Sequence, residues 1–274
     1  MKNTGILRIQ AFGARQSSPI EGVLVTVSGN GFTAQRITDE TGTAADLSIE
    51  APSCALSLQE DNTIRPYAVV DLTAVKAGYR TVRIQGVQIF AGQVTLAQPE
   101  MIPDTEEGRD IPNVPVVIPE HSLFTGDGGS GPEPVQNCVP RVLDRVIIPK
   151  NITVHLGRPA ASARNVTVSF RDYIANVASS EVYPTWPEQA LRANIHAQIS
   201  LALNRIWTEW YPSRGYSFNI TGSPGYDQAY VNGRTVFAVM ERLTAELFNT
   251  FVQRSGDACL LYTSPSPRDK RQSR

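Results

Sequence analysis

Short runs in which every second residue is apolar dominate the N-terminal part of the chain. In one run Leu7, Ile9 and Ala11 alternate with Arg8 and Gln10. Similar runs occur at 23–27, 47–49 and 82–96. A period of two with many β-branched residues is typical of half-buried β-strands. Because turn sequences such as Ser28-Gly29-Asn30-Gly31 separate the runs, residues 1–98 are predicted to form an all-β sandwich.

The apolar period changes beyond residue 150. Two more short strands are expected there, followed by three segments in which apolar residues recur every three to four positions. Ser169 opens the first of these helices, Thr185 caps the second, and the third covers 235–254. Residues 150–256 are therefore predicted to form a mainly α domain with a few strands. The predicted fold class is α+β and multidomain.

The segment 99–149 separates the two predicted domains. It holds nine of the 19 prolines of the chain and the glycine-rich run 126–131. Proline favours extended backbone and glycine favours flexible backbone, so the segment is expected to be a linker. Such a linker would also be open to an activating protease, which is one of the expected partners.

Composition and charge exclude several classes of protein. The chain has 274 residues, and 25 Lys and Arg side chains against 26 Asp and Glu side chains give a net charge of -1. This balance does not predict a nucleic-acid-binding surface. No apolar run is long enough to predict a membrane span, and no signal peptide is seen. The three histidines are isolated in the sequence, so neither a metal site nor a cofactor is expected.

Glu181 is the strongest candidate for a reacting group. Val182, Tyr183, Pro184 and Trp186 follow it, and a carboxyl group walled by apolar and aromatic groups is desolvated. Desolvation favours the protonated carboxyl, which is the form that a general acid needs. The alternative is a solvated carboxylate at the end of a helix, because spacing in the sequence does not show burial.

A resemblance adds to this interpretation. Residues 168–193 resemble the stage II sporulation protein D family, with a Tyr-Ile helix, a Glu at 181, a Pro-x-Trp-Pro turn and a Glu-x-x-Leu-x-Ala helix start. Residues 226–230 look like the later Asp-Gln-x-Tyr segment of that family. In the N-terminal part, residues 19–27, 38–42 and 76–79 resemble the transthyretin-like, or carboxypeptidase regulatory-like, sandwich. The order of the two domains is similar to that of spore cortex-lytic enzymes.

The resemblance implies that peptidoglycan glycan strands are cleaved by lytic transglycosylation. Glu181 takes the position of the catalytic acid and base, and Tyr183, Trp186, Tyr226 and Gln228 take substrate-binding positions. No metal ion or cofactor is implied, and the expected location is a sporulating cell or spore, at the cortex or coat. The alternative, from another class of function, is a non-catalytic protein that binds peptidoglycan or activates an amidase. A purely structural, adhesin-like role would explain only the sandwich.

The last residues differ in character from the rest. Residues 259–269, Cys-Leu-Leu-Tyr-Thr-Ser-Pro-Ser-Pro-Arg-Asp, resemble one translated frame of a sequencing-library adapter. Residues 257–274 are therefore expected to be a disordered tail derived from an adapter. On this hypothesis the domain at 150–256 is truncated, and the full-length parent rather than this chain is expected to be the active enzyme. The alternative is a natural Ser/Pro/Arg-rich tail.

Overall fold

A computed structural model describes residues 3–13, 18–59, 62–104, 114–121, 123, 143 and 145–252. Contacts group the chain into two compact units. The sandwich unit comprises Met1–Asp127, Ser179–Pro187 and Val231–Glu241, and the helical unit comprises Gly128–Ala178, Glu188–Tyr230 and Arg242–Arg274. The predicted tail at 257–274 lies outside the described residues.

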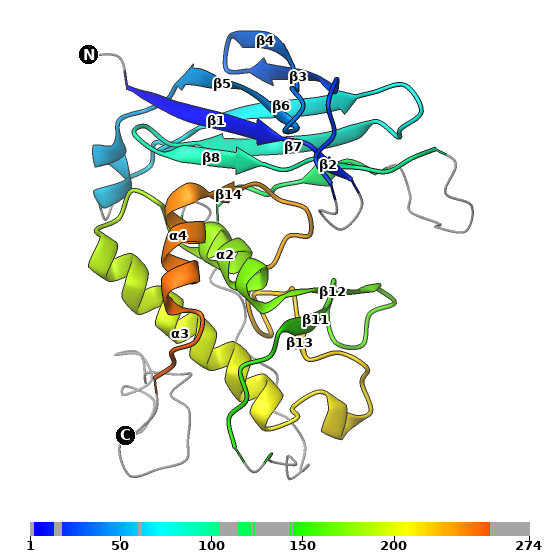
Figure 1. The fold of residues 1–274 in the computed structure, drawn as a ribbon. Coiled ribbons are helices and arrows are strands. Elements are labelled where there is room, and N and C mark those ends of the chain that lie inside the picture. The colour runs from blue at the N-terminus through cyan, green and yellow to red at the C-terminus, as the bar shows by residue number, and fades with distance from the viewer. Residues whose placement is uncertain are drawn as a thin grey trace. The chain divides into compact units, whose positions relative to one another are not determined.

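Two sheets form the sandwich unit (Figure 1). The first has the order β14-β8-β1-β5, made of Val236–Phe237, Val94–Ala97, Thr4–Gln10 and Thr43–Glu50. The second has the order β10-β7-β6-β3-β4, made of Val116–Val117, Val82–Ile89, Ala68–Val75, Leu24–Gly29 and Phe32–Ile37. A short pair, β2 (Phe12–Gly13) and β9 (Glu100–Met101), and the 3-10 helix η2 (Cys54–Leu58) complete it.

One apolar core lies between the two sheets. Leu7 and Ile9 of β1 point into it from the first sheet, and Val25 and Val27 of β3 point into it from the second. These are apolar positions of the alternating runs, because successive side chains of a strand face opposite sides. The α+β fold class with an N-terminal β-sandwich is confirmed.

Residues far from the N-terminus complete the sandwich. β10 pairs in parallel with β7, with Val116 opposite Ile84, although it lies in the segment predicted as a linker. β14 pairs antiparallel with β8, with Val236 opposite Leu96. Both pairings join stretches that are distant in sequence, so local apolar patterns do not reveal them.

The helical unit combines a small sheet with helices. The sheet has the order β12-β11-β13, made of Asn165–Ser169, Asn151–His155 and Ile220–Thr221. The helices are α2 (Phe170–Glu181), whose last three residues belong to the sandwich unit, α3 (Glu188–Trp207), the 3-10 helix η3 (Pro212–Arg214) and α4 (Ala238–Leu247), which begins in the sandwich unit.

The predicted helices differ from the observed ones mainly at their ends. Ser169 caps α2 as expected, since its Oγ accepts a hydrogen bond from the Asp172 N–H at 3.1 Å. The second helix begins at Glu188 rather than directly after Thr185, whose hydroxyl instead meets Ser57. The third pattern, expected at 235–254, divides into β14 and the shorter α4, because Val236 and Phe237 join the sheet.

None of the helices in the described ranges is both long enough and apolar enough to cross a membrane.

Candidate functional site

Glu181 is the last residue of α2 and is half-buried. It belongs to the sandwich unit together with Tyr183 and Trp186. The three buried residues that follow it, Val182–Pro184, form a tight turn in which the Trp186 N–H donates to the Tyr183 carbonyl at 3.2 Å. The carboxyl group of Glu181 therefore lies where helix α2 meets a closely packed turn.

Two hydrogen bonds hold the end of α2 just before Glu181. Arg234 Nη1 donates to Ser180 Oγ at 2.6 Å. The Phe237 N–H donates to Ser179 Oγ at 3.2 Å. Both bonds are buried, so they exchange little with water and fix the backbone from which Glu181 projects.

Two further hydrogen bonds hold the chain after Glu181. Trp186 Nε1 donates to the Ser57 carbonyl at 3.1 Å. The hydroxyl oxygens of Thr185 and Ser57 are 2.7 Å apart. The segment that carries Glu181 is thus anchored on both sides within the sandwich unit, and the indole of Trp186 stays half-exposed.

Tyr183 lies in an aromatic cluster and has only 7% of its surface exposed. Its ring centroid is 4.5 Å from that of His121 and 5.5 Å from that of Phe90. Burial, with a smaller contribution from Tyr67, raises the pKa of Tyr183 to about 12. In this arrangement the Tyr183 ring packs against other aromatic rings and offers little surface to a ligand.

His121 and Arg234 are buried polar residues that the sequence did not single out. Burial, followed by the charge of Arg234, lowers the pKa of His121 to about 3, against a smaller upward effect of the Val182 backbone. His121 Nδ1 accepts from the Leu123 N–H at 3.3 Å, so the proton of the neutral ring lies on Nε2. A histidine that is neutral throughout the physiological range cannot donate a proton as an imidazolium.

Arg234 remains charged although it is buried. Burial lowers its pKa to about 9, opposed by Tyr67. In the part of the chain that the structure describes, its hydrogen-bond partners are the Ser180 hydroxyl and the Thr235 carbonyl, with no carboxylate. A buried cation with only neutral oxygens as partners is costly, and loss of the Ser180 hydroxyl would add to that cost.

Tyr226 and Gln228 belong to the helical unit. Gln228 is 3% exposed, and both ends of its amide are used. Its Oε1 accepts from the Tyr173 hydroxyl at 2.9 Å, and its Nε2 donates to the Gln198 carbonyl at 3.2 Å. Tyr226 is half-buried, and its carbonyl accepts from Arg205 Nη2 at 3.3 Å. Gln228 therefore secures the loop against α2 and α3.

Asp227, between these two residues, is the centre of a buried network. Its Oδ1 accepts from Arg205 Nε at 2.6 Å, and its Oδ2 accepts from the hydroxyls of Tyr211 at 2.6 Å and Thr221 at 2.7 Å. Burial, and then the Asp227 charge, raise the pKa of Tyr211. Sequence reasoning included Asp227 in the Asp-Gln-x-Tyr segment but gave it no role, because its partners are scattered along the chain and share no spacing.

No three His, Cys, Asp or Glu residues within the described ranges are placed so that they could hold a metal ion.

Comparisons with known proteins give partial similarities to solved structures. No protein-family profile matches the chain, and no curated protein matches it. The TIE protein of Bacillus anthracis shares 15% identity over 37% of this chain and 17% of its own length, with a TM-score of 0.27. The 3-chlorocatechol 1,2-dioxygenase of Rhodococcus opacus shares 15% identity over 37% of this chain and 60% of its own length, with a TM-score of 0.25.

A third similar structure is the 5-hydroxyisourate hydrolase of Klebsiella pneumoniae. It shares 20% identity over 35% of this chain and 86% of its own length, with a TM-score of 0.22. The chain covers 17% of the length of the first of these structures and 60% of the length of the second. It therefore spans less than two thirds of either. The chain is thus partly similar, at low identity, to structures that include a transthyretin-like protein and catechol dioxygenases.

Proposed function

We propose that the whole protein acts on peptidoglycan and cleaves its glycan strands by lytic transglycosylation, with Glu181 as the single general acid and base. The resemblance of residues 168–193 to the stage II sporulation protein D family supports this proposal. The observation that carries it is the place of Glu181, half-buried at the end of α2 and anchored on both sides. A catalytic acid needs this combination of access, partial desolvation and fixed position.

Glu181 would perform two proton transfers in one turnover. Protonated Glu181 donates its proton to the leaving sugar oxygen as the glycosidic bond breaks. The carboxylate then accepts the proton of the muramyl 6-hydroxyl while that oxygen bonds to the anomeric carbon. Glu181 regains its proton, no water is consumed, and the muramyl end closes into an anhydro ring. A second carboxylate, which most glycosidases need, is unnecessary in this scheme.

Other residues would position the substrate or the Glu181 segment rather than react. The half-exposed indole of Trp186 offers a face on which a sugar ring can stack. Arg234 and Ser57 hold the two sides of the Glu181 segment. Tyr226 and Gln228 remain proposed substrate-binding residues, and the packing of Gln228 means that it would act mainly by shaping its loop. We further propose that the substrate is spore cortex, in sporulation or germination, with protease cleavage of the predicted linker as activation.

The experiment is a digestion of purified peptidoglycan by the whole protein. The Glu181→Gln variant keeps the shape of the side chain and removes the acid, so release of anhydro-muropeptides should fall by roughly 100-fold or more. The matched control is Glu40→Gln, which makes the same change at an exposed turn and should leave the rate unchanged. Equal release by the parent and the Glu181→Gln variant would show that Glu181 is not the acid.

A second candidate function is peptidoglycan binding without cleavage. The observation that favours it is the half-exposed indole of Trp186, which can stack on a sugar ring without any reacting group. Sedimentation of the chain with insoluble peptidoglycan, without any soluble product over long incubation, would select this candidate over cleavage.

A further inference from the structure

β4 differs from the other edge strands of the sandwich. Among the described residues the two sheets end in β14, β5, β10 and β4. β14 and β10 have two residues each, and the register of β5 against β1 shifts between Leu7 and Ile9. β4 pairs with β3 at each of its six residues and contains neither lysine nor proline. Short length, bulges, lysine and proline protect an edge against pairing, so β4 is the least protected edge.

Three residues of β4 direct their backbone groups to the open edge. Thr38, the residue after β4, bonds toward β3, because its N–H donates to the Val23 carbonyl at 3.1 Å. Residues that bond toward a neighbouring antiparallel strand alternate with residues that point away from it. The residues of β4 that point away from β3 are therefore Thr33, Gln35 and Ile37.

Most of these outward backbone groups have no partner within the described ranges. The three residues offer three N–H groups and three carbonyl groups, and the Gln35 carbonyl accepts from Arg36 Nη1 at 2.8 Å. The other five groups have no hydrogen-bond partner in the part of the chain that the structure describes. Such an edge can accept a further strand through main-chain hydrogen bonds.

A row of apolar side chains crosses the outer face of the sheet and ends at this edge. Ile37 of β4 lies opposite Leu24 of β3, and Leu24 lies opposite Val75 of β6. Side chains of opposite residues project from the same face, and these three are 67%, 38% and 41% exposed. A strand added beside β4 would place one more side chain next to Ile37. An apolar side chain there would remove apolar surface from water.

Negative charge gathers where β4 ends. Asp39 and Glu40 follow β4 and are exposed. Glu21 is also exposed, and the N–H of the next residue donates to the Thr38 carbonyl at 2.9 Å, which places Glu21 near this end. Lys76 offsets part of the charge, and its Nζ donates to the Glu21 carbonyl at 2.7 Å. A basic side chain in the added strand is therefore favoured at this end.

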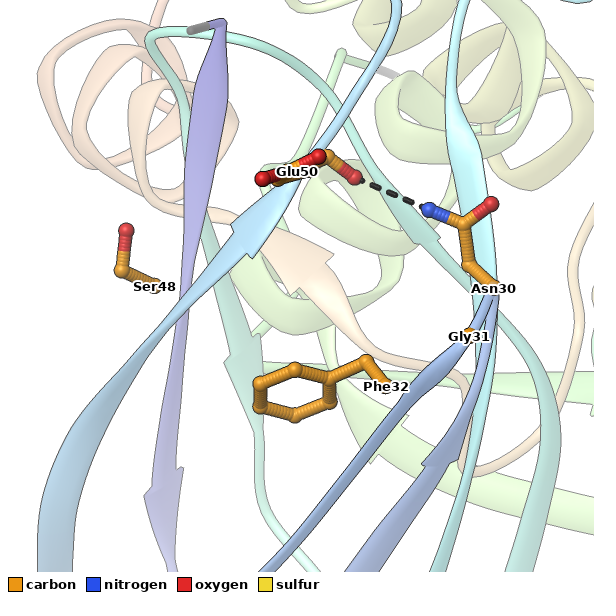
Figure 2. A pocket seen from close by; sticks show the side chains of 5 residues that line it. All are labelled: Asn30, Gly31, Phe32, Ser48 and Glu50. Carbon is orange, nitrogen blue, oxygen red and sulfur yellow. Dashed lines mark hydrogen bonds between the residues drawn. The ribbon is translucent and has the colours of Figure 1, made fainter.

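β4 is fixed in place before a partner arrives. Asn30 and Gly31 have φ angles of 52° and 70° and form the two-residue turn that leads into β4. Asn30 Nδ2 donates to the Glu50 carbonyl of β5 at 3.1 Å (Figure 2). Figure 2 also shows the ring of Phe32, which packs against the core, extending from β4 toward β5. A strand that is already ordered loses little conformational freedom on pairing.

A second copy of the chain fits this edge poorly. Antiparallel pairing of two β4 strands with Gln35 opposite Gln35 places Ile37 opposite Thr33, so the two apolar rows do not meet. The rows meet only when Ile37 lies opposite Ile37. In that register Gln35 lies opposite Asp39, which is beyond the end of β4. The apolar row therefore favours a different partner.

We infer that the open edge of β4 pairs antiparallel with an extended peptide segment of another protein, which carries an apolar residue opposite Ile37 and a basic residue beside Asp39 and Glu40. Main-chain hydrogen bonds supply the affinity, and the apolar row and the charge set the register. Antiparallel order places the basic residue N-terminal to the apolar one. This inference is independent of glycan cleavage and needs no reaction at Glu181.

The test is binding of the end-blocked peptide Lys-Thr-Val-Glu-Thr-Val-Thr to the whole chain, measured by calorimetry and NMR. Its first valine is designed to lie opposite Ile37 and its lysine opposite Asp39, and the expected Kd is about 0.1 mM. N-methylation of this valine removes an N–H that faces β4 and should weaken binding about tenfold or more. N-methylation of the glutamate alters an N–H that points away and should leave the Kd within about threefold.

Variants of the chain test the same edge. Gln35→Pro removes an outward N–H without removing a bond to β3, so it should weaken binding about tenfold or more in a chain that circular dichroism shows to be folded. The control Gln35→Thr keeps the N–H and should leave the Kd within about twofold. Ile37→Glu should also weaken binding, whereas Ile64→Glu, at a residue 60% exposed outside β4, should leave it unchanged.

Three results would overturn the inference. The first is a peptide that does not bind the parent chain with a Kd below about 1 mM. The second is equal binding of the two N-methylated peptides. The third is a parent chain that sediments as a dimer and becomes a monomer on Gln35→Pro, which would show that a second copy occupies the edge. The peptidoglycan digestion stays informative in each case, because it reports on Glu181.

Discussion

Asp227 has no exposed side-chain surface, and Arg205, its ion-pair partner, has 6% exposed. Both carboxylate oxygens of Asp227 accept hydrogen bonds, from Arg205, Tyr211 and Thr221. A fully satisfied buried network of this kind specifies one arrangement of its loop, since any partial loss leaves a charge without its partner.

The change Asp227→Asn removes the anion and leaves the Arg205 guanidinium buried. The free energy of unfolding, measured by urea titration, should fall by about 3–5 kcal/mol. The matched control is Asp46→Asn, which breaks the exposed pair with Arg8, where the side chains are 40% and 50% exposed. That control should cost about 0–1 kcal/mol. Equal losses for the two variants would contradict the importance of the buried network.

His121 makes the stability of the sandwich unit depend on pH. Its pKa is about 3 in the folded chain against 6.5 for an exposed histidine, so between these values the unfolded chain binds more protons. The free energy of unfolding should therefore decrease as the pH falls from 6.5 toward 3. The expected loss from this residue is about 2 kcal/mol between pH 6.5 and pH 4.5.

The variant His121→Leu should remove this part of the pH dependence. The control His196→Leu makes the same replacement on α3, leaves His121 in place and should keep the slope of the parent. Urea titrations at several pH values measure the free energy of unfolding of both variants. A His121→Leu chain whose stability changes with pH as steeply as that of the parent would contradict the assignment.

At the scale of elements, Gly86 allows β10 to approach β7. Gly86 has a φ of +80°, and a Cβ added there would lie 2.3 Å from the Ile118 carbonyl oxygen. The Gly86 N–H also donates to Asp71 Oδ1 at 2.9 Å, which fixes this part of β7. A side chain at this position would therefore separate β10 from the sheet.

The change Gly86→Ala should lower the free energy of unfolding by roughly 2–5 kcal/mol, from left-handed backbone strain together with the collision. The matched control is Gly31→Ala, where φ is +70° but nothing lies within 4 Å of the added Cβ. That change should cost only about 1 kcal/mol. Thermal unfolding measures the loss of stability in each variant. Similar losses in the two variants would show that the pairing of β10 does not depend on Gly86.

The sequence predicted the elements whose pattern is local. Alternation around Leu7 and Val25 located strands, and Ser169 marked the start of α2, because each depends on neighbouring residues. β14 was missed, since Val236 and Phe237 also fit the helical period and only pairing with β8 makes them a strand. For the candidate site, the sequence proposed Glu181, which stays a prediction, and could not show that Tyr183 is buried, because His121 and Phe90 reach it from distant positions.

At the scale of the whole molecule, the sandwich unit is discontinuous in sequence. Ser179–Pro187 and Val231–Glu241 belong to it although they lie far beyond the N-terminal strands. Phe90 shows the consequence: its ring contacts Tyr183 and Phe237, with centroids 5.5 and 5.3 Å apart. Part of the sandwich unit is therefore covered by residues near Glu181.

A fragment limited to Met1–Asp127 should be less stable than the whole chain. It lacks β14 and uncovers Phe90, and each large apolar side chain exposed in this way costs about 1.5–3 kcal/mol. The expected result is a lower Tm and binding of a hydrophobic dye, both measured against the whole chain. A fragment with an unchanged Tm and no dye binding would show that the later segments contribute little to the sandwich.

The central claim is that Glu181 cleaves glycan strands without water as the nucleophile. The most direct measurement is a peptidoglycan digestion in water labelled with a heavy oxygen isotope, followed by mass spectrometry of the new muramyl ends. The account predicts anhydro ends that carry no label, because the attacking oxygen is the muramyl hydroxyl. Labelled reducing ends, which show hydrolysis, or the absence of any new ends would contradict it.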